Sequence, residues 1–145
     1  SPYIKDALIF GNENHPCICG IIVIDFEMVG KWAEDNGINY TTFVDLSQKS
    51  VVAELVLNDI KRVNNLLPET TRIKRYVLLH KEFDPDEGEL TRTRKIKRKV
   101  MYKKYNELID AIYSGKPSVD VVAEVKYRDG RLGKIKTELR IRDVE

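Results

Sequence analysis

The segment from Pro16 to Ile24 constrains the fold more than any other part of this sequence. It contains the longest apolar stretch, Ile21-Ile22-Val23-Ile24, which has the length of a buried strand and is far shorter than the roughly 18 apolar residues of a membrane span. A strand with one face in water alternates apolar and polar residues, whereas this stretch is apolar at successive positions. We therefore expect a central strand that is covered on both faces.

Two further strands are expected around this central one. Residues Ile4–Phe10 resemble a short strand, or the end of a helix leading into one, and Gly11–Asn14 has the composition of a turn. Residues Ile73–Leu79 are rich in β-forming side chains and predict another strand. An acidic-to-basic loop from Lys81 to Arg94 follows. The side chains of the stretch Asp84–Arg98 are expected to be exposed and free to swing.

Three helices are expected between and after these strands. Asp25 is a suitable N-cap for the first, which ends at Asn36-Gly37. After a polar stretch over Asn39–Asp45, apolar residues at helical spacing predict the second helix from about Ser47 to Leu66. The third is expected from near Ile96 to Gly115.

The end of the sequence predicts a β-hairpin. Apolar and polar residues alternate over Val119–Tyr127 and again over Ile135–Ile141, and Asp129-Gly130 lies between the two runs. Because strands and helices interleave without a strict βαβ rhythm, we predict an α+β fold. This fold is a small mixed sheet with about three helices packed on it, plus a C-terminal β-hairpin extension.

Charge is unevenly distributed, although the 145 residues carry a net charge of only +2. The segment from Arg92 to Lys104 contains eight basic and no acidic residues, and the acidic stretch from Glu82 to Glu89 precedes it. A helix start favours acids rather than bases, so cations there suggest an anionic partner such as a phosphate or carboxylate. A solvated basic helix face is the commoner explanation of such a run.

The cysteine pattern gives no closed metal site. His15, Cys17 and Cys19 alternate along one strand, but a closed zinc site needs four ligands and only His80 is left. We therefore expect buried strand thiols, a satisfied structural histidine at position 80 and no metal. Free thiols and the absence of a secretory signal predict a cytoplasmic location.

The stretch from Gly88 to Arg98 resembles the C-terminal lysine motif of adenylate-forming enzymes. The general pattern is Pro-Lys-Thr-x-Ser-Gly-Lys-Ile-x-Arg. The matching or similar positions are Thr91, Thr93, Lys95, Ile96 and Arg98, whereas Arg94, Leu90 and Glu89 replace the glycine, the first lysine and the proline. The variant of long-chain acyl-CoA synthetases, Leu-Thr-x-Thr-x-Lys-x-Lys-Arg, fits Leu90 to Arg98 throughout.

The resemblance extends over residues 1–115, with Ser1–Ala7, Ile22–Asp25 and Val63–Pro68 in the expected order. It implies a C-terminal lid domain over residues 1–115 and a β-hairpin extension of the same domain over residues 116–145. The family activates a carboxylate, here a long-chain fatty acid, with ATP to acyl-AMP and then transfers the acyl group to CoA. The resemblance assigns ATP and Mg²⁺ mainly to an N-terminal adenylation domain outside this chain, so the fragment alone is expected to be inactive.

The resemblance also assigns roles to individual residues. Lys95 is the candidate catalytic residue, which would neutralise charge during adenylation. Lys97 is the second candidate for this role. Thr91, Thr93, Lys97 and Arg98 are candidates for binding the phosphate, the adenylate or CoA.

Two alternatives come from other classes of protein. The basic helix could bind nucleic acid through its cations. The balanced total charge argues against this, and so does the scarcity of nearby aromatics: only Tyr102 and Tyr105 are close, and Tyr105 falls on the apolar face. The hairpin could instead add to the sheet edge of a partner protein. Peripheral contact of the basic helix with a membrane is compatible with the acyl-CoA synthetase function that the resemblance implies.

Overall fold

A computed structural model describes residues 1–12, 15–127 and 129–144. The strands are β1 (Ile4–Asn12), β2 (His15–Ile24), β3 (Ile73–Leu78), β4 (Ser118–Lys126) and β5 (Leu132–Asp143). The helices are α1 (Phe26–Asp35), α2 (Phe43–Ser47), α3 (Ser50–Asn64), the short 3-10 helix η1 (Glu69–Thr71), α4 (Arg98–Lys104) and α5 (Asn106–Tyr113). No helix of the described residues is both long enough and apolar enough to cross a membrane.

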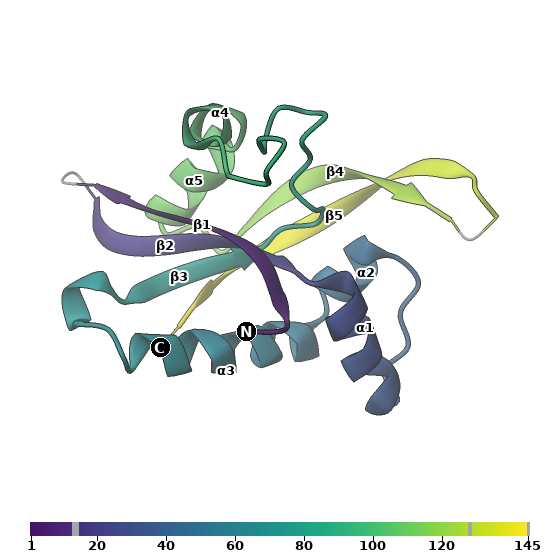
Figure 1. Ribbon diagram of the computed structural model, residues 1–145, viewed down its shortest axis with the longest axis horizontal. Helices are drawn as coiled ribbons and strands as arrows, with labels where there is room; N and C mark the ends of the chain where they lie inside the picture. Colours follow the sequence, from purple (N-terminus) through teal and green to yellow (C-terminus); the bar gives the residue numbers. More distant parts are fainter. Residues whose placement is uncertain (13–14, 128, 145) are drawn as a thin grey trace.

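The five strands form one mixed sheet in the order β1-β2-β3-β5-β4 (Figure 1). Strand β2 pairs antiparallel with β1 and parallel with β3, so it lies inside the sheet, as its apolar sequence predicts. Strand β5 pairs antiparallel with both β3 and β4. The predicted α+β fold with a small mixed sheet is therefore confirmed.

Both faces of β2 are buried because helices cover the sheet on both sides. Cys19, Ile21 and Val23 point into a core that also contains residues of α4 and α5. Ile22 and Ile24 point into a second core, with residues of α1 and α3. Figure 1 shows the resulting layers, with α4 and α5 above the sheet and α1 and α3 below it.

The hairpin of β4 and β5 begins inside the sheet and projects away from it (Figure 1). Its strands pair from Ser118 with Arg140 to Lys126 with Leu132. Beyond this ladder, Ile141–Asp143 pairs with β3, so β5 belongs to both the hairpin and the sheet. At the predicted turns, Gly130 has a φ of 88°, while Arg128 and residues 13–14 lie outside the described part of the chain.

The second predicted helix is confirmed over Ser50–Asn64 but is wrong in its first turn. Instead of one helix from about Ser47, the chain forms α2, two intervening residues and then α3. Thr42 caps α2 by accepting a hydrogen bond from the Asp45 N–H, so part of the predicted polar stretch is helical. After α2, the Gln48 side chain donates to the Leu78 carbonyl at 2.9 Å, which fixes the break beside β3.

The third predicted helix is two helices. It begins at Arg98 rather than near Ile96, and Tyr105, with φ −102° and ψ 21°, interrupts the chain between α4 and α5. The predicted apolar face is nevertheless present, because Met101, Leu108 and Ile112 all lie in the core above the sheet. The first helix is confirmed, and Asp25 caps it by accepting a hydrogen bond from the Met28 N–H.

Candidate functional site

The segment Glu89–Lys97, here called the lysine turn, connects the acidic loop after β3 to α4. It is closed at its base by an antiparallel bridge between Leu90 and Ile96 and by a 3.0 Å hydrogen bond from the Lys97 N–H to the Glu89 carbonyl. Leu90 is buried in the core above the sheet. The expectation that the side chains of this loop are exposed is wrong for Glu89 and Leu90, which are buried. The buried and hydrogen-bonded base also fixes the backbone there.

Two threonines shape the turn from inside. The Thr91 N–H donates to the Lys95 carbonyl at 2.8 Å, and the Thr91 hydroxyl accepts a hydrogen bond from the Lys95 N–H at 3.0 Å. The Thr93 hydroxyl lies 3.2 Å from the Thr91 hydroxyl. Both hydroxyls therefore have partners within the turn, and their roles in substrate binding stay predictions.

Arg94 occupies the tightest position of the turn. Its φ of 65° makes it the one non-glycine residue with positive φ among the described residues, and its N–H donates to the Thr91 carbonyl at 2.9 Å. Glycine adopts this conformation without strain, whereas other residues rarely do. The backbone therefore has the shape of a glycine position where the general lysine motif has its glycine, which supports the alignment that makes Lys95 the motif lysine.

Some basic side chains in and just after the turn form hydrogen bonds within the protein, whereas others are exposed and have no partner among the described residues. Lys95 and Lys97 are exposed, and neither side chain forms an ion pair or hydrogen bond with a described residue. Arg98, in contrast, donates to the Ile9 carbonyl of β1 at 2.9 Å and lies 3.4 Å from the Tyr102 hydroxyl. The role of Arg98 in substrate binding stays a prediction.

A buried carboxylate, Glu89, lies beneath the lysine turn and was missed as a functional candidate in the sequence. Its side chain is fully buried and accepts hydrogen bonds from the Tyr105 hydroxyl and from the Asp84 N–H. It also forms ion pairs with Lys81 and Lys104, each at 3.3 Å. A buried charge needs such partners, so this network fixes the base of the turn against α4 and α5.

The exposed Glu87 joins the same two lysines from the solvent side. Its carboxylate lies 2.6 Å from both Lys81 and Lys104, and their hydrogen bonds lower its pKa to about 2. Burial and the hydrogen bond to Glu89 raise the pKa of the Tyr105 phenol, so it stays a donor over the working pH range. The network beneath the lysine turn therefore contains one buried carboxylate, Glu89, and one exposed carboxylate, Glu87, which share the same two lysines.

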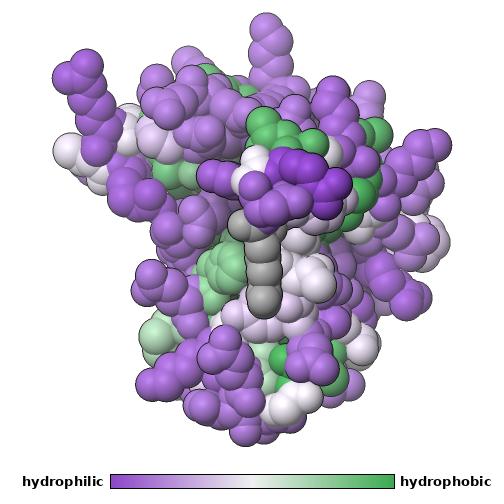
Figure 2. All heavy atoms as spheres, turned by 90° about the vertical axis from the view of Figure 1, so that its right-hand side faces the viewer, coloured by the Kyte–Doolittle hydropathy of each residue, from purple (hydrophilic) through white to green (hydrophobic). Residues whose placement is uncertain are grey.

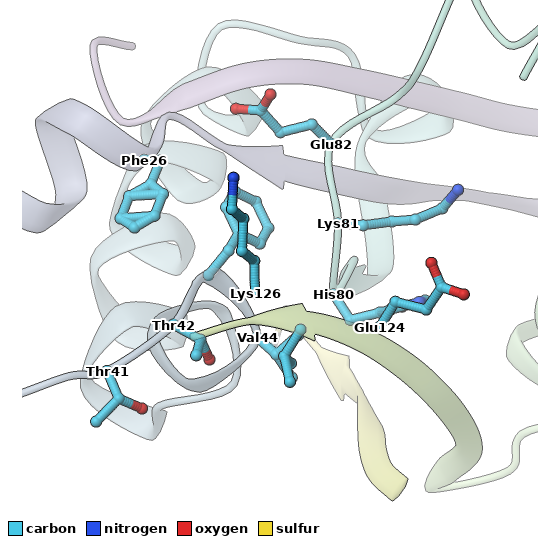
Figure 3. A pocket seen from close by; sticks show the side chains of 11 residues that line it. Phe26, Thr41, Thr42, Val44, His80, Lys81, Glu82, Glu124 and Lys126 are labelled. Carbon is cyan, nitrogen blue, oxygen red and sulfur yellow. The ribbon is translucent and has the colours of Figure 1, made fainter. Parts of the chain in front are cut away.

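A cavity of about 440 Å³ lies near this network but does not include the lysine turn. Figure 3 shows its walls, with His80, Lys81 and Glu82 from the segment after β3 and Glu124 and Lys126 from β4. The remaining lining residues are Phe26, Thr41, Thr42, Phe43, Val44 and Val125. Cations and carboxylates share these walls, so the cavity has no single charge preference.

The expectation that His80 is a satisfied structural histidine is wrong. Its Nδ1 is buried and has no hydrogen-bond partner among the described residues. Burial, together with the adjacent Lys81, lowers its pKa from 6.5 to about 4. His80 is therefore neutral at pH 7.

Lowering the pH from 7.5 to 5 is expected to destabilise the fold through His80. Between pH 6.5 and pH 4 the unfolded chain protonates this histidine and the folded chain does not, so its contribution is complete above pH 6.5 and falls as the pH drops. We expect a loss on the order of 1 kcal/mol at pH 5, measured by urea unfolding.

His80→Gln is the matched variant for this measurement. It should lose that part of the pH dependence, and an unchanged pH dependence would exclude His80 as the cause. Glu87 does not interfere, because its lowered pKa makes its own contribution fall only below pH 4.5.

The two cysteines are both free, but only Cys19 is buried. Cys17 is exposed, contrary to expectation, because it precedes the part of β2 that pairs with β3, which begins at Ile18. The side chain of His15 lies outside the described part of the structure. Within that part, no group of three or more His, Cys, Asp or Glu side chains could hold a metal ion.

Comparison with known proteins gives one family and several relatives. The family described as AMP-binding enzyme C-terminal domain matches residues 1–117. The chain is 32% identical over 114 residues to Long-chain-fatty-acid–CoA ligase FadD15 of Mycobacterium tuberculosis (strain ATCC 25618 / H37Rv) and of Mycobacterium bovis (strain ATCC BAA-935 / AF2122/97). Each match covers 78% of this chain and 19% of the relative, so the chain spans about a fifth of their length.

Two solved structures share the fold. The adenylation domain of the carboxylate reductase from Mycobacterium chelonae matches with a TM-score of 0.59 and 18% identity, over 79% of this chain and 16% of that one. The A-PCP didomain of the carboxylic acid reductase from Segniliparus rugosus, in complex with AMP, matches with a TM-score of 0.54 and 15% identity. That match covers 79% of this chain and 14% of the other.

Proposed function

Because the chain belongs to the family of AMP-binding enzyme C-terminal domains, we propose that it is the lid domain of a long-chain fatty-acid–CoA ligase. The lid comprises residues 1–115, and the hairpin of residues 116–145 extends it. The ligase works in the cytoplasm, and its other part is an N-terminal adenylation domain of the same polypeptide. The 32% identity to two long-chain fatty-acid–CoA ligases supports the acyl class.

The observation that carries this proposal is an exposed lysine on a turn whose base is fixed. Lys95 follows Arg94, whose backbone has the conformation of the motif glycine, and its ammonium group is not paired with any described residue. A cation that is already neutralised within its own domain could not serve a substrate in another. Lys95 is therefore free to reach the adenylation domain when the lid closes over it.

The chemistry proposed for Lys95 is electrostatic. In the first half-reaction a fatty-acid carboxylate oxygen attacks the α-phosphorus of ATP, a phosphorus–oxygen bond breaks, and pyrophosphate leaves with the bonding electrons. Negative charge accumulates around the α-phosphate during this step, and the Lys95 ammonium group stabilises it. In the second half-reaction the CoA thiol attacks the acyl-adenylate and AMP leaves, and we assign Lys95 no role in that step.

Other substrate contacts follow from the same proposal. Lys97 is an exposed cation of the turn with no partner among the described residues, so it is the second candidate for the phosphate groups. As the family resemblance implies, we assign Mg²⁺ and most ATP contacts to the adenylation domain. The isolated chain should then have no ligase activity.

Removing residues 1–145 from the full polypeptide tests the lid assignment. With the lid present, long-chain fatty acids should drive exchange between pyrophosphate and ATP, and CoA should yield the thioester. Without it, both activities should fall to background while the adenylation domain still binds ATP. An exchange rate that is unchanged by the deletion would contradict the proposal.

The nucleic-acid alternative has a separate test. Lys95 and Lys97 of the basic segment Arg92–Lys104 lack a partner among the described residues. Phosphate contacts by such cations give binding that weakens steeply as salt rises. We expect the chain to show no salt-sensitive binding when it is titrated with duplex or single-stranded DNA at low ionic strength. Strong salt-sensitive binding would favour the alternative.

A further inference from the structure

An ion pair connects the lysine turn to a strand that lies far from it in the sequence. The Arg94 Nη2 lies 3.0 Å from the Asp6 Oδ2 of β1, across 88 residues of sequence. The Asp6 side chain is only 14% exposed, whereas that of Arg94 is 50% exposed. The acidic partner is thus held in the sheet, and the basic partner comes from the turn.

Arg94 keeps this contact in spite of its backbone. A φ of 65° is uncommon for residues with a side chain, and glycine would adopt it freely. The hydrogen bonds of the turn use only the backbone of Arg94, so glycine would preserve them. Glycine could not supply the Arg94 guanidinium group that pairs with Asp6. Strain that is retained at one position points to a function for the side chain there.

We propose that the ion pair between Asp6 and Arg94, here called the tether, positions the lysine turn so that the adjacent Lys95 meets the reacting α-phosphate. This inference rests on the proposed role of Lys95 in adenylation. Arg94 and Asp6 are positioning residues, because they act through Lys95 and do not touch substrate.

The tether supplies a restraint that the rest of the structure does not. The base of the turn is fixed by the Lys97–Glu89 hydrogen bond, and the start of α4 by the bond from Arg98 to the Ile9 carbonyl. Both contacts lie below the tip of the turn, where Arg94 and Lys95 are located. Among the residues that the structure describes, only the tether joins the tip to β1 by an ion pair or hydrogen bond, so its loss leaves the base intact and allows the tip to tilt.

Asp6→Asn in the full ligase tests this idea, because it removes the charge and keeps the shape. A displacement of about 1 Å can slow a reaction by up to 100-fold, so we expect kcat for fatty-acid-dependent ATP–pyrophosphate exchange to fall about tenfold. KM for ATP and thioester formation from preformed acyl-adenylate should not change. Burial raises the pKa of the Asp6 carboxyl in spite of the nearby Arg94, so the ion pair adds little to stability and Tm should change little.

Lys5→Gln is the matched control. It breaks the neighbouring ion pair of Lys5 with Glu82, which has an N–O distance of 3.3 Å and does not touch the lysine turn. This variant should leave both half-reactions unchanged. Equal losses in Asp6→Asn and Lys5→Gln would show a general effect of the strand surface and would overturn the proposal.

Two variants of Arg94 separate the tether from the backbone strain. Arg94→Gly relieves the strain but removes the tether, so exchange should slow as in Asp6→Asn even though Tm holds or rises. Arg94→Lys retains the charge and should recover most of the rate. Full exchange activity in Arg94→Gly would overturn the proposal.

Comparison with Lys95→Ala distinguishes failure of the tether from failure of the proposed role of Lys95. If Lys95→Ala abolishes exchange and Asp6→Asn has no effect, the tether is refuted and the role of Lys95 stands. If Lys95→Ala has no effect on exchange, the role of Lys95 is refuted, and the tether is refuted with it.

Discussion

Lys95→Ala in the full ligase is expected to slow acyl-adenylate formation by about 100-fold to 1,000-fold, the usual effect of removing one charge-stabilising group. The ammonium group of Lys95 has no partner among the described residues, so its removal should leave the fold unchanged. The rate should be measured as ATP–pyrophosphate exchange driven by a long-chain fatty acid. Thioester formation from preformed acyl-adenylate should continue at the normal rate.

Lys97→Ala is the matched control for this prediction. Lys97 lies two residues further along, is also exposed, and also forms no ion pair with a described residue. We expect it to slow exchange by less than about tenfold, as the loss of one exposed phosphate contact would. A reversed order of the two effects would move the catalytic role to Lys97, and two unaffected half-reactions would remove it from the turn altogether.

Glu89→Ala is expected to reduce the free energy of unfolding by about 3 kcal/mol, the largest stability effect that we predict. The substitution leaves the Tyr105 hydroxyl without its acceptor and deprives Lys81 and Lys104 of a fully buried partner. Both lysines are about one third exposed and can turn toward water, which limits the loss. Urea unfolding at pH 7 provides the measurement.

Glu87→Ala tests whether the stability contributed by this network depends on burial of the carboxylate or on its distance from the lysines. Glu87 lies closer than Glu89 to the same two lysines, at 2.6 Å from each, but it is 49% exposed. An exposed ion pair contributes less than about 1 kcal/mol. If Glu87→Ala destabilised the chain as much as Glu89→Ala, the buried network would not be the feature that stabilises the base of the lysine turn.

The elements that the sequence predicted well are those whose cause is local. The apolar run before Asp25 specifies a strand buried on both faces, and the Asp25 side chain itself caps α1. The hairpin follows from alternation and from Asp129-Gly130, where Gly130 adopts positive φ. In each case a few neighbouring residues determine the structure, so the sequence alone suffices.

The errors arise where contacts between distant segments decide the structure. The break after α2 depends on the Gln48 side chain reaching the Leu78 carbonyl, 30 residues away. The break between α4 and α5 lies at Tyr105, whose hydroxyl donates to Glu89, 16 residues away. Neither position carries a proline or glycine that would reveal the break. The capping Thr42 was a local signal for α2 and was overlooked.

The candidate site was predicted in part for the same reason. Motif resemblance selected Lys95 from eight basic residues, but it could not show which of the other basic side chains form contacts within the protein. The bond from Arg98 to β1 and the pairing of Arg94 with Asp6 join segments more than 80 residues apart. In the sequence, Glu89 only replaces the proline of the general motif. The structure shows that it is buried beneath the turn.

The double pairing of β5 has a consequence for how the chain acquires its structure during synthesis. Strand β3 obtains its second neighbour only when Asp143 is available, 68 residues after Arg75. Until then β3 has an open edge, and the ribosome makes the lysine turn, α4, α5 and β4 in the meantime. Contacts of such long sequence separation slow folding, and an open strand edge invites pairing with other chains. The lysine turn is thus made before the sheet that will present it is closed.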